Sequence, residues 1–125
     1  MNAKNPLAVF IVIAMMAVAN LADAAELSVR SRDEIQHLLA RLGNSGCEFN
    51  RNGNWYSAAE AQTHLTHKLD YLVKRNLLAS SEDFIALGAS KSSMSGKAYQ
   101  VKCANAKAVD SAVWLGEALL RYRAQ

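Results

Sequence analysis

The chain has 125 residues, 51% of them hydrophobic and 20% charged, and its 14 basic and 11 acidic residues give a net charge of +3. This length suits one domain and is too short for two. The basic residues are scattered along the chain rather than gathered in one block. A mild positive charge favours association with anionic polymers without specifying nucleic acid, and we expect no nucleic-acid partner.

The first 24 residues have the pattern of a secretory signal peptide. Lys4 precedes an apolar run from Leu7 to Ala19, and the small-residue triplet at 22–24 follows as an A-x-A cleavage site. A retained membrane anchor is the alternative, but a spanning helix needs about 20 apolar residues and this run is shorter. We therefore expect cleavage after Ala24, a single domain over residues 25–125, no membrane span after cleavage, and a periplasmic location.

Two cysteines, Cys47 and Cys103, remain after the predicted cleavage. An even number of cysteines in an oxidising compartment favours a structural disulfide. Closing a loop of about 57 residues would stabilise the fold by roughly 4 kcal/mol on the chain-entropy model. A reactive or metal-binding thiol is the alternative, but the chain contains no C-x-x-C pair. The sequence therefore predicts a Cys47–Cys103 disulfide.

Two amphipathic helices are predicted in the first half of the domain. A helix over 32–42 follows a Ser31–Glu34 capping box and ends at Gly43, and a helix over 58–76 follows a Ser57–Glu60 capping box. Apolar residues recur at helical spacing in both segments. The predicted inward faces are Ile35, Leu38, Leu39 and Leu42 in the first helix, and Ala58, Ala61, Leu65, Leu69 and Leu72 in the second.

Two further helices are predicted in the second half. Ser80 or Ser81 caps a short helix that Gly88 can end, and Asp110 caps a last helix. Arg121 and Arg123 lie near the C-terminal end of the last helix, where cations suit the helix dipole. The apolar residues are Phe84, Ile85 and Leu87 in the short helix, and Val113, Trp114, Leu115, Ala118 and Leu119 in the last, where we expect them to point inward.

Asn52-Gly53 is the preferred pair for a two-residue type I′ hairpin turn, and it joins predicted strands over 47–51 and 54–56. A third strand is predicted over 98–103, with Tyr99, Val101 and Cys103 on one side. The element order is then α-β-β-α-α-β-α. We expect an α+β fold in which a small three-stranded antiparallel sheet packs with about four helices.

Residues 45–123 carry a series of short motifs in a particular order: Arg51-Asn52-Gly53, Tyr56, Ala61, His64-Leu65, Lys68, Phe84-Ile85, Ala89-Ser90, Ser92-Ser93, Ser95-Gly96 and Tyr99. This series resembles the YfeK-like family of small exported bacterial proteins of unknown function. The resemblance covers most of the predicted mature chain and implies a periplasmic location. It implies no known activity.

Candidate catalytic and metal chemistry is sparse. His64, His67 and Asp70 follow one another at three-residue steps, but Asp70 falls on the opposite side of the predicted helix. A catalytic zinc needs three convergent protein ligands, and we predict neither a metal site nor a cofactor. The serine-rich stretch 90–96 has no Gly-x-Ser-x-Gly elbow. Turn chemistry and an anion-binding nest of loop amides are its two open interpretations.

Three segments are expected to meet at one side of the second helix. His64 and Lys68 both lie on that side, because they are four residues apart. The hairpin tip leads into this helix, and the serine loop leads into the strand expected beside the hairpin. If the segments converge, they form a small basic cleft suited to a carboxylate, a phosphate or an envelope glycan. The alternative is that His64 and Lys68 only hold the loop. The candidate binding residues are Arg51, Asn52, His64, Lys68, Ser92, Ser93 and Ser95.

The first functional hypothesis is a non-catalytic binding or interaction module of the cell envelope, with an envelope protein or an anionic or glycan ligand as its partner. The alternative is a small hydrolase or transferase of envelope polymers, with His64 as base and a loop serine as nucleophile. A third hypothesis, an inhibitor or stress-response accessory protein, would require an exposed aromatic side chain such as Trp55 within an apolar patch.

Overall fold

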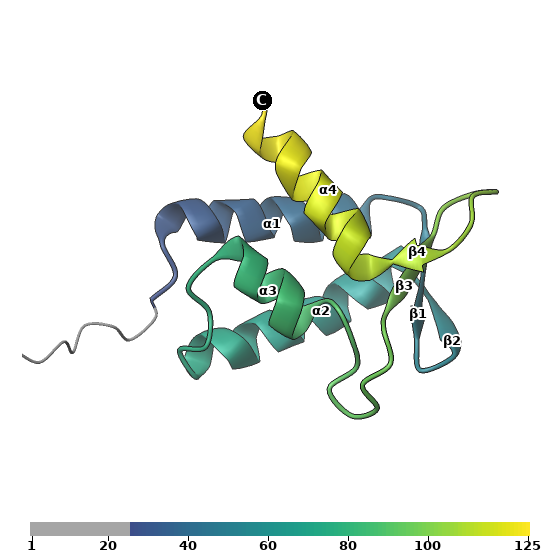
Figure 1. Cartoon of the computed structure of the whole chain (residues 1–125), viewed down its shortest axis with the longest axis horizontal. Coiled ribbons are helices and arrows are strands. Elements are labelled where there is room, and N and C mark those ends of the chain that lie inside the picture. The colour runs from purple at the N-terminus through teal and green to yellow at the C-terminus, as the bar shows by residue number, and fades with distance from the viewer. Residues whose placement is uncertain (1–25) are drawn as a thin grey trace, which may run out of the picture.

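A computed structural model describes residues 26–125, so the predicted signal peptide and its cleavage site lie outside the described residues. The elements are α1 (Val29–Gly43), β1 (Glu48–Arg51), β2 (Asn54–Ser57), α2 (Ala58–Lys74), α3 (Ser81–Gly88), β3 (Gln100–Lys102), β4 (Val109–Asp110) and α4 (Ser111–Arg123). The helices pack together, and the small sheet lies beside one end of them (Figure 1). The predicted α+β class is confirmed.

The sheet is antiparallel, with strand order β2-β1-β3-β4. The predicted hairpin register is confirmed, since Phe49 faces Tyr56 across the turn. Phe49 also faces Val101 of β3, so the third strand lies against the hairpin as expected. The prediction of three strands was wrong, because Val109 and Asp110 pair with β3 as a fourth strand. Two residues are too few to show strand alternation, so only the pairing identifies β4.

The N-termini of α1 and α2 differ in how far they follow the predictions. α2 has the predicted capping box. The Glu60 carboxylate accepts the amide of Ser57 at 3.0 Å, and the Ser57 hydroxyl accepts the amide of Glu60 at 3.1 Å. In α1 the predicted Ser31–Glu34 box is wrong. The helix begins at Val29, where the Oγ of Ser28 accepts the amide of Ser31 at 3.0 Å. The Glu34 side chain is buried against other helices and is therefore not available to cap its own.

The N-termini of α3 and α4 show a similar contrast. Ser80, one of the two candidates, caps α3 by accepting the amide of Asp83 at 3.0 Å. Asp110 occupies the N-cap position of α4, but its side chain makes no capping hydrogen bond.

The C-terminal end of α2 also differs from the prediction, since the helix ends at Lys74 and not at residue 76.

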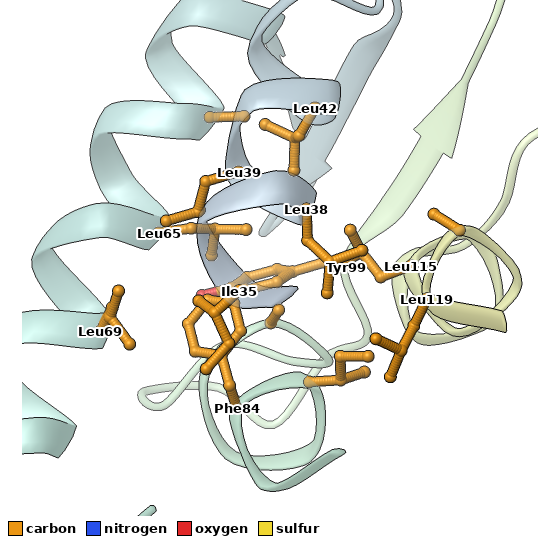
Figure 2. Close-up of a cluster of buried hydrophobic side chains, with 14 of the residues drawn as sticks. Ile35, Leu38, Leu39, Leu42, Leu65, Leu69, Phe84, Tyr99, Leu115 and Leu119 are labelled. Carbon is orange, nitrogen blue, oxygen red and sulfur yellow. The ribbon is translucent and has the colours of Figure 1, made fainter. Parts of the chain in front are cut away.

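The hydrophobic core lies between the helices and one face of the sheet. Ile35, Leu38, Leu39 and Leu42 of α1 point toward apolar side chains of α2, α3 and α4 (Figure 2). The prediction that Val113 points inward was wrong, since its side chain is 53% exposed, and Leu87 of α3 is exposed at 51%. Trp114 is half-buried, and its ring packs edge-on against the Phe49 ring, with the ring centres 6.0 Å apart.

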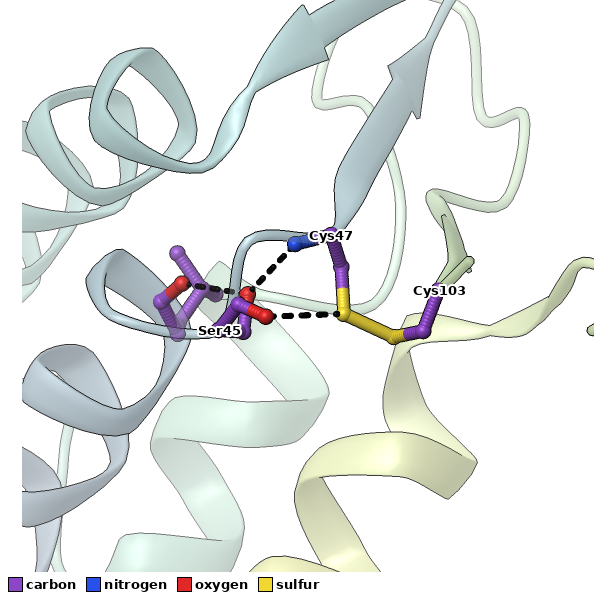
Figure 3. Close-up of a disulfide and its surroundings, with 4 residues drawn as sticks. Ser45, Cys47 and Cys103 are labelled. Carbon is purple, nitrogen blue, oxygen red and sulfur yellow. Dashed lines mark hydrogen bonds between the residues drawn. A yellow bond between two sulfur atoms is a disulfide. The ribbon is translucent and has the colours of Figure 1, made fainter. Parts of the chain in front are cut away.

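Cys47 and Cys103 form the predicted disulfide, with their Cα atoms 4.3 Å apart (Figure 3). Cys47 directly precedes β1 and Cys103 directly follows β3, so the bridge joins two neighbours of the sheet at one end. Ser45 positions the first cysteine. Its Oγ donates to the carbonyl of Leu42 at 2.8 Å and accepts the amide of Cys47 at 3.1 Å.

A buried carboxylate connects three helices. Glu34 of α1 accepts two hydrogen bonds from the guanidinium of Arg123 in α4, at 2.8 and 2.9 Å, and one from the Ser81 hydroxyl in α3 at 2.7 Å. Arg123 also donates to Glu82. The hydrogen bonds from Arg123 lower the pKa of Glu34 to about 2, against the opposing effect of burial. Arg123 therefore does more than complement the dipole of α4.

Candidate functional site

A cleft of about 440 Å³ opens where the β1–β2 turn, one side of α2 and the segment between α3 and β3 meet. The three segments that the sequence suggested as neighbours therefore converge. Of the candidate residues, all but Ser95 line the cleft. The cleft lining consists of Arg51, Asn52, His64, His67, Lys68, Tyr71, Leu72, Leu87, Ser92, Ser93, Met94 and Tyr99.

The hydroxyl of Tyr99 is at the centre of this arrangement. Lys68 donates to it from Nζ at 3.1 Å, and Nε2 of His64 lies at the same distance. Nη1 of Arg51 lies 3.1 Å from Nδ1 of His64 and 3.3 Å from Nε2. Arginine can only donate, so His64 accepts from it, and a neutral ring accepting at Nδ1 can donate from Nε2 to Tyr99.

Burial and positive charge shift the titration of these groups. The pKa of His64 is lowered mainly by burial and further by the charges of Arg51 and Lys68. Burial also lowers the pKa of Lys68, with a smaller contribution from Arg51, and raises the pKa of Tyr99. The shift at His64 favours its neutral form, which the hydrogen bonds require.

The cleft has positive charge that no carboxylate among its described lining residues balances. Within residues 26–125 no acidic side chain lines it, and neither Arg51 nor Lys68 forms an ion pair. By contrast, Arg123, at the other end of the described chain, pairs with two carboxylates.

The loop serines differ in their structural roles. The buried Ser92 accepts the amides of Met94 and Ser95 at 3.1 and 3.2 Å, which is turn chemistry. Ser95 donates to Oδ1 of Asn52 and so ties the loop to the hairpin tip instead of lining the cleft. Ser93 is exposed at the cleft wall. Lys68 also reaches the loop, donating to the carbonyl of Lys91 at 3.3 Å.

Tyr99 is the residue that sequence reasoning missed. The alternation of the third strand placed it correctly on the inward side, where its ring packs in the core (Figure 2). A buried tyrosine normally finds a partner for its hydroxyl, and that rule was the available signal. Its partners, Lys68 and His64, come from α2 and lie 31 and 35 residues away in the sequence.

The other candidate residues do not gather into a second centre. His67 lies on the cleft wall, whereas Asp70 does not line it. No group of three His, Cys, Asp or Glu side chains in the part of the chain that the structure describes could hold a metal ion. Trp55 is exposed on β2.

A family model covers most of the described chain, matching residues 29–123. The chain belongs to DUF5329, a family of unknown function. No curated protein and no solved structure matches this DUF5329 chain. The sequence resemblance also pointed to a family of unknown function, and this part of the prediction is confirmed. The YfeK-like relationship and export stay predictions. No helix of the DUF5329 chain within residues 26–125 is both long and apolar enough to cross a membrane.

Proposed function

We propose that this DUF5329 protein is a non-catalytic binding module of the cell envelope whose cleft takes an anionic group, such as a carboxylate, a phosphate or the acidic part of a glycan. The observation that carries the proposal is the pairing of two cations, Arg51 and Lys68, beside His64 and Tyr99 with no carboxylate among the described cleft residues. Half-buried cations in such a position gain from an anionic partner.

The donors needed for an anion remain available. Arg51 uses Nη1 toward His64, and within residues 26–125 its Nε and Nη2 groups make no hydrogen bond. These two groups can therefore form the two parallel hydrogen bonds that carboxylates and phosphates accept. Lys68 has three N–H groups and uses two of them, toward Tyr99 and Lys91. The proposed role in the envelope rests on the predicted signal peptide, and the disulfide fits an exported protein.

The predicted hydrolase or transferase gains no support from this arrangement. The ring nitrogens of His64 face Arg51 and Tyr99, and no hydrogen bond within residues 26–125 joins the ring to a loop serine. A serine nucleophile needs its base within hydrogen-bond reach.

The test is a titration of the purified, disulfide-bonded protein with acetate and inorganic phosphate at low ionic strength, followed by NMR. We expect amide and side-chain shifts at Arg51, His64 and Lys68. Arg51→Gln should weaken binding by about tenfold or more, as expected for the loss of a charge-assisted hydrogen-bond pair.

Arg41→Gln is the matched control. Arg41 also stacks on an aromatic ring, that of Trp114 at 5.7 Å, but it does not line the cleft. Both variants lose one positive charge. Equal weakening by both variants would mean that only net charge attracts the anion, and the site assignment would then be wrong.

A further inference from the structure

A second cavity of about 160 Å³ lies between the hairpin and α2, next to the cleft. Its walls are mainly apolar and come from β1, β2 and α2, with Tyr99 just before β3 and Ser111 at the start of α4. Its apolar lining residues include Phe49, Tyr56, Ala61 and Leu65. An apolar cavity of about 150 Å³ is large enough to hold benzene, so this one has room for a ring-sized group.

Arg51, His64 and Tyr99 line both the cavity and the cleft. The Arg51 guanidinium carbon lies 5.2 Å from the centre of the Tyr56 ring, which belongs to the cavity wall. The His64 and Tyr99 rings meet edge to face, with their centres 6.0 Å apart. The cationic group therefore borders both spaces, and a ligand that carries an anion and an apolar ring would find a partner for each beside Arg51.

The polar groups of the cavity also orient such a ligand. Glu60 is the acidic residue among the described lining residues, and its carboxylate is held by the amide of Ser57 at 3.0 Å in the α2 capping box. A ligand anion near Glu60 would be repelled, whereas near Arg51 it would be attracted. The charged end of a ligand therefore belongs at Arg51, and its apolar end among Phe49, Ala61 and Leu65.

We infer that the ligand is an amphiphilic anion: a carboxylate or phosphate attached to a compact apolar group about the size of one ring. The inference rests on the proposed anion-binding function and names its ligand class. The anionic group binds Arg51 and Lys68 in the cleft. The ring fills the cavity under the hairpin, where burying its surface adds affinity that acetate or inorganic phosphate cannot gain.

The experiment compares three probes by NMR titration of the full disulfide-bonded protein: benzoate, acetate and benzyl alcohol. Benzoate has both the anion and the ring, and each of the others lacks one of them. We expect benzoate to bind at least about tenfold more tightly than either, given the apolar area that the ring buries. Ring protons of benzoate should show NOEs to the methyl groups of Ala61 and Leu65.

A cavity-filling variant tests the position of the ring. Ala61→Leu should lower the affinity for benzoate to that for acetate and leave acetate binding unchanged. Ala59→Leu is the matched control, since Ala59 is exposed on the same helix, and it should leave both affinities unchanged. If Ala61→Leu fails to fold, the three-probe comparison and the NOEs on the unmodified protein still decide the question.

The outcomes separate this inference from the proposal beneath it. Equal affinities for acetate and benzoate, or NOEs from the ring to Met94 and Leu87 in the cleft, would overturn the inference and leave anion binding intact. If benzyl alcohol bound as tightly as benzoate, the anionic group would add no affinity, and the inference of an amphiphilic anion would be wrong. Binding of none of the anions would overturn both the inference and the proposed function.

Discussion

Replacing Glu34 with glutamine should make the stability of this protein less dependent on pH in the acid range. The carboxylate is buried, with 4% of its side chain exposed, and accepts hydrogen bonds from Arg123 and Ser81. Glutamine has nearly the same shape and can still accept from Ser81, but it carries no charge for Arg123. The substitution therefore removes mainly the ion pair.

The magnitude follows from the pKa of Glu34, which drops from its usual 4.5 to about 2 in the folded protein, chiefly through the Arg123 hydrogen bonds. A drop of this size corresponds to about 3 kcal/mol of stability by proton linkage. The Arg123 side chain is 30% exposed, so solvent screens part of the interaction and we expect about 2 kcal/mol. Because the folded pKa is lowered, this stability is present above pH 4.5 and is lost as the pH falls toward about 2.

The assay is urea unfolding followed by circular dichroism from pH 7 down to pH 2, for the unmodified protein and Glu34→Gln. The free energies of unfolding should differ by about 2 kcal/mol at neutral pH and converge near pH 2. Glu82→Gln is the control, because Glu82 pairs with the same arginine but its side chain is 59% exposed, so its loss should cost about 1 kcal/mol or less. A difference between the unmodified protein and Glu34→Gln that stays constant with pH would refute the reasoning.

Three further predictions concern the disulfide, His64 and the loop. Replacing both Cys47 and Cys103 with serine should lower stability by up to about 4 kcal/mol on the chain-entropy model, and thermal melts with and without reductant will measure the loss. The pKa of His64 should lie below 6.5 in an NMR titration and rise in Arg51→Gln, since burial and the neighbouring cation lower it; protonation as the pH falls should therefore destabilise the fold. Ser92→Ala should cost about 1–2 kcal/mol and speed hydrogen exchange of the loop amides, because two amides lose their buried acceptor; unchanged exchange would contradict this role.

Much of this fold could be predicted from short stretches of sequence. The Asn52-Gly53 pair set the hairpin register, and the Ser57–Glu60 spacing marked the start of α2, because both structures depend on residues a few positions apart. The same local reasoning failed at Ser31–Glu34, where the spacing is that of a capping box. Arg123, 89 residues away, takes the carboxylate instead. A local motif predicts structure only where no distant partner competes for the same group.

The candidate site divides in the same way. Helical periodicity put His64 and Lys68 on one side of α2, and their convergence with the hairpin tip and the serine loop follows from the predicted order of the strands. Whether that cleft binds a ligand stays a proposal. The role of the Tyr99 hydroxyl, by contrast, depends on contacts across the sheet-helix boundary that no spacing encodes.

The sequence by itself determined the helices, the hairpin and the pairing of Cys47 with Cys103, because periodicity, turn chemistry and cysteine number act over short distances or leave a single choice. Only the tertiary structure decided the fourth strand, the Glu34–Arg123 ion pair and the cavity beneath the hairpin. Strand pairing, buried charge pairs and empty volume arise from how distant surfaces meet, and residual space between packed side chains has no signature in the order of residues.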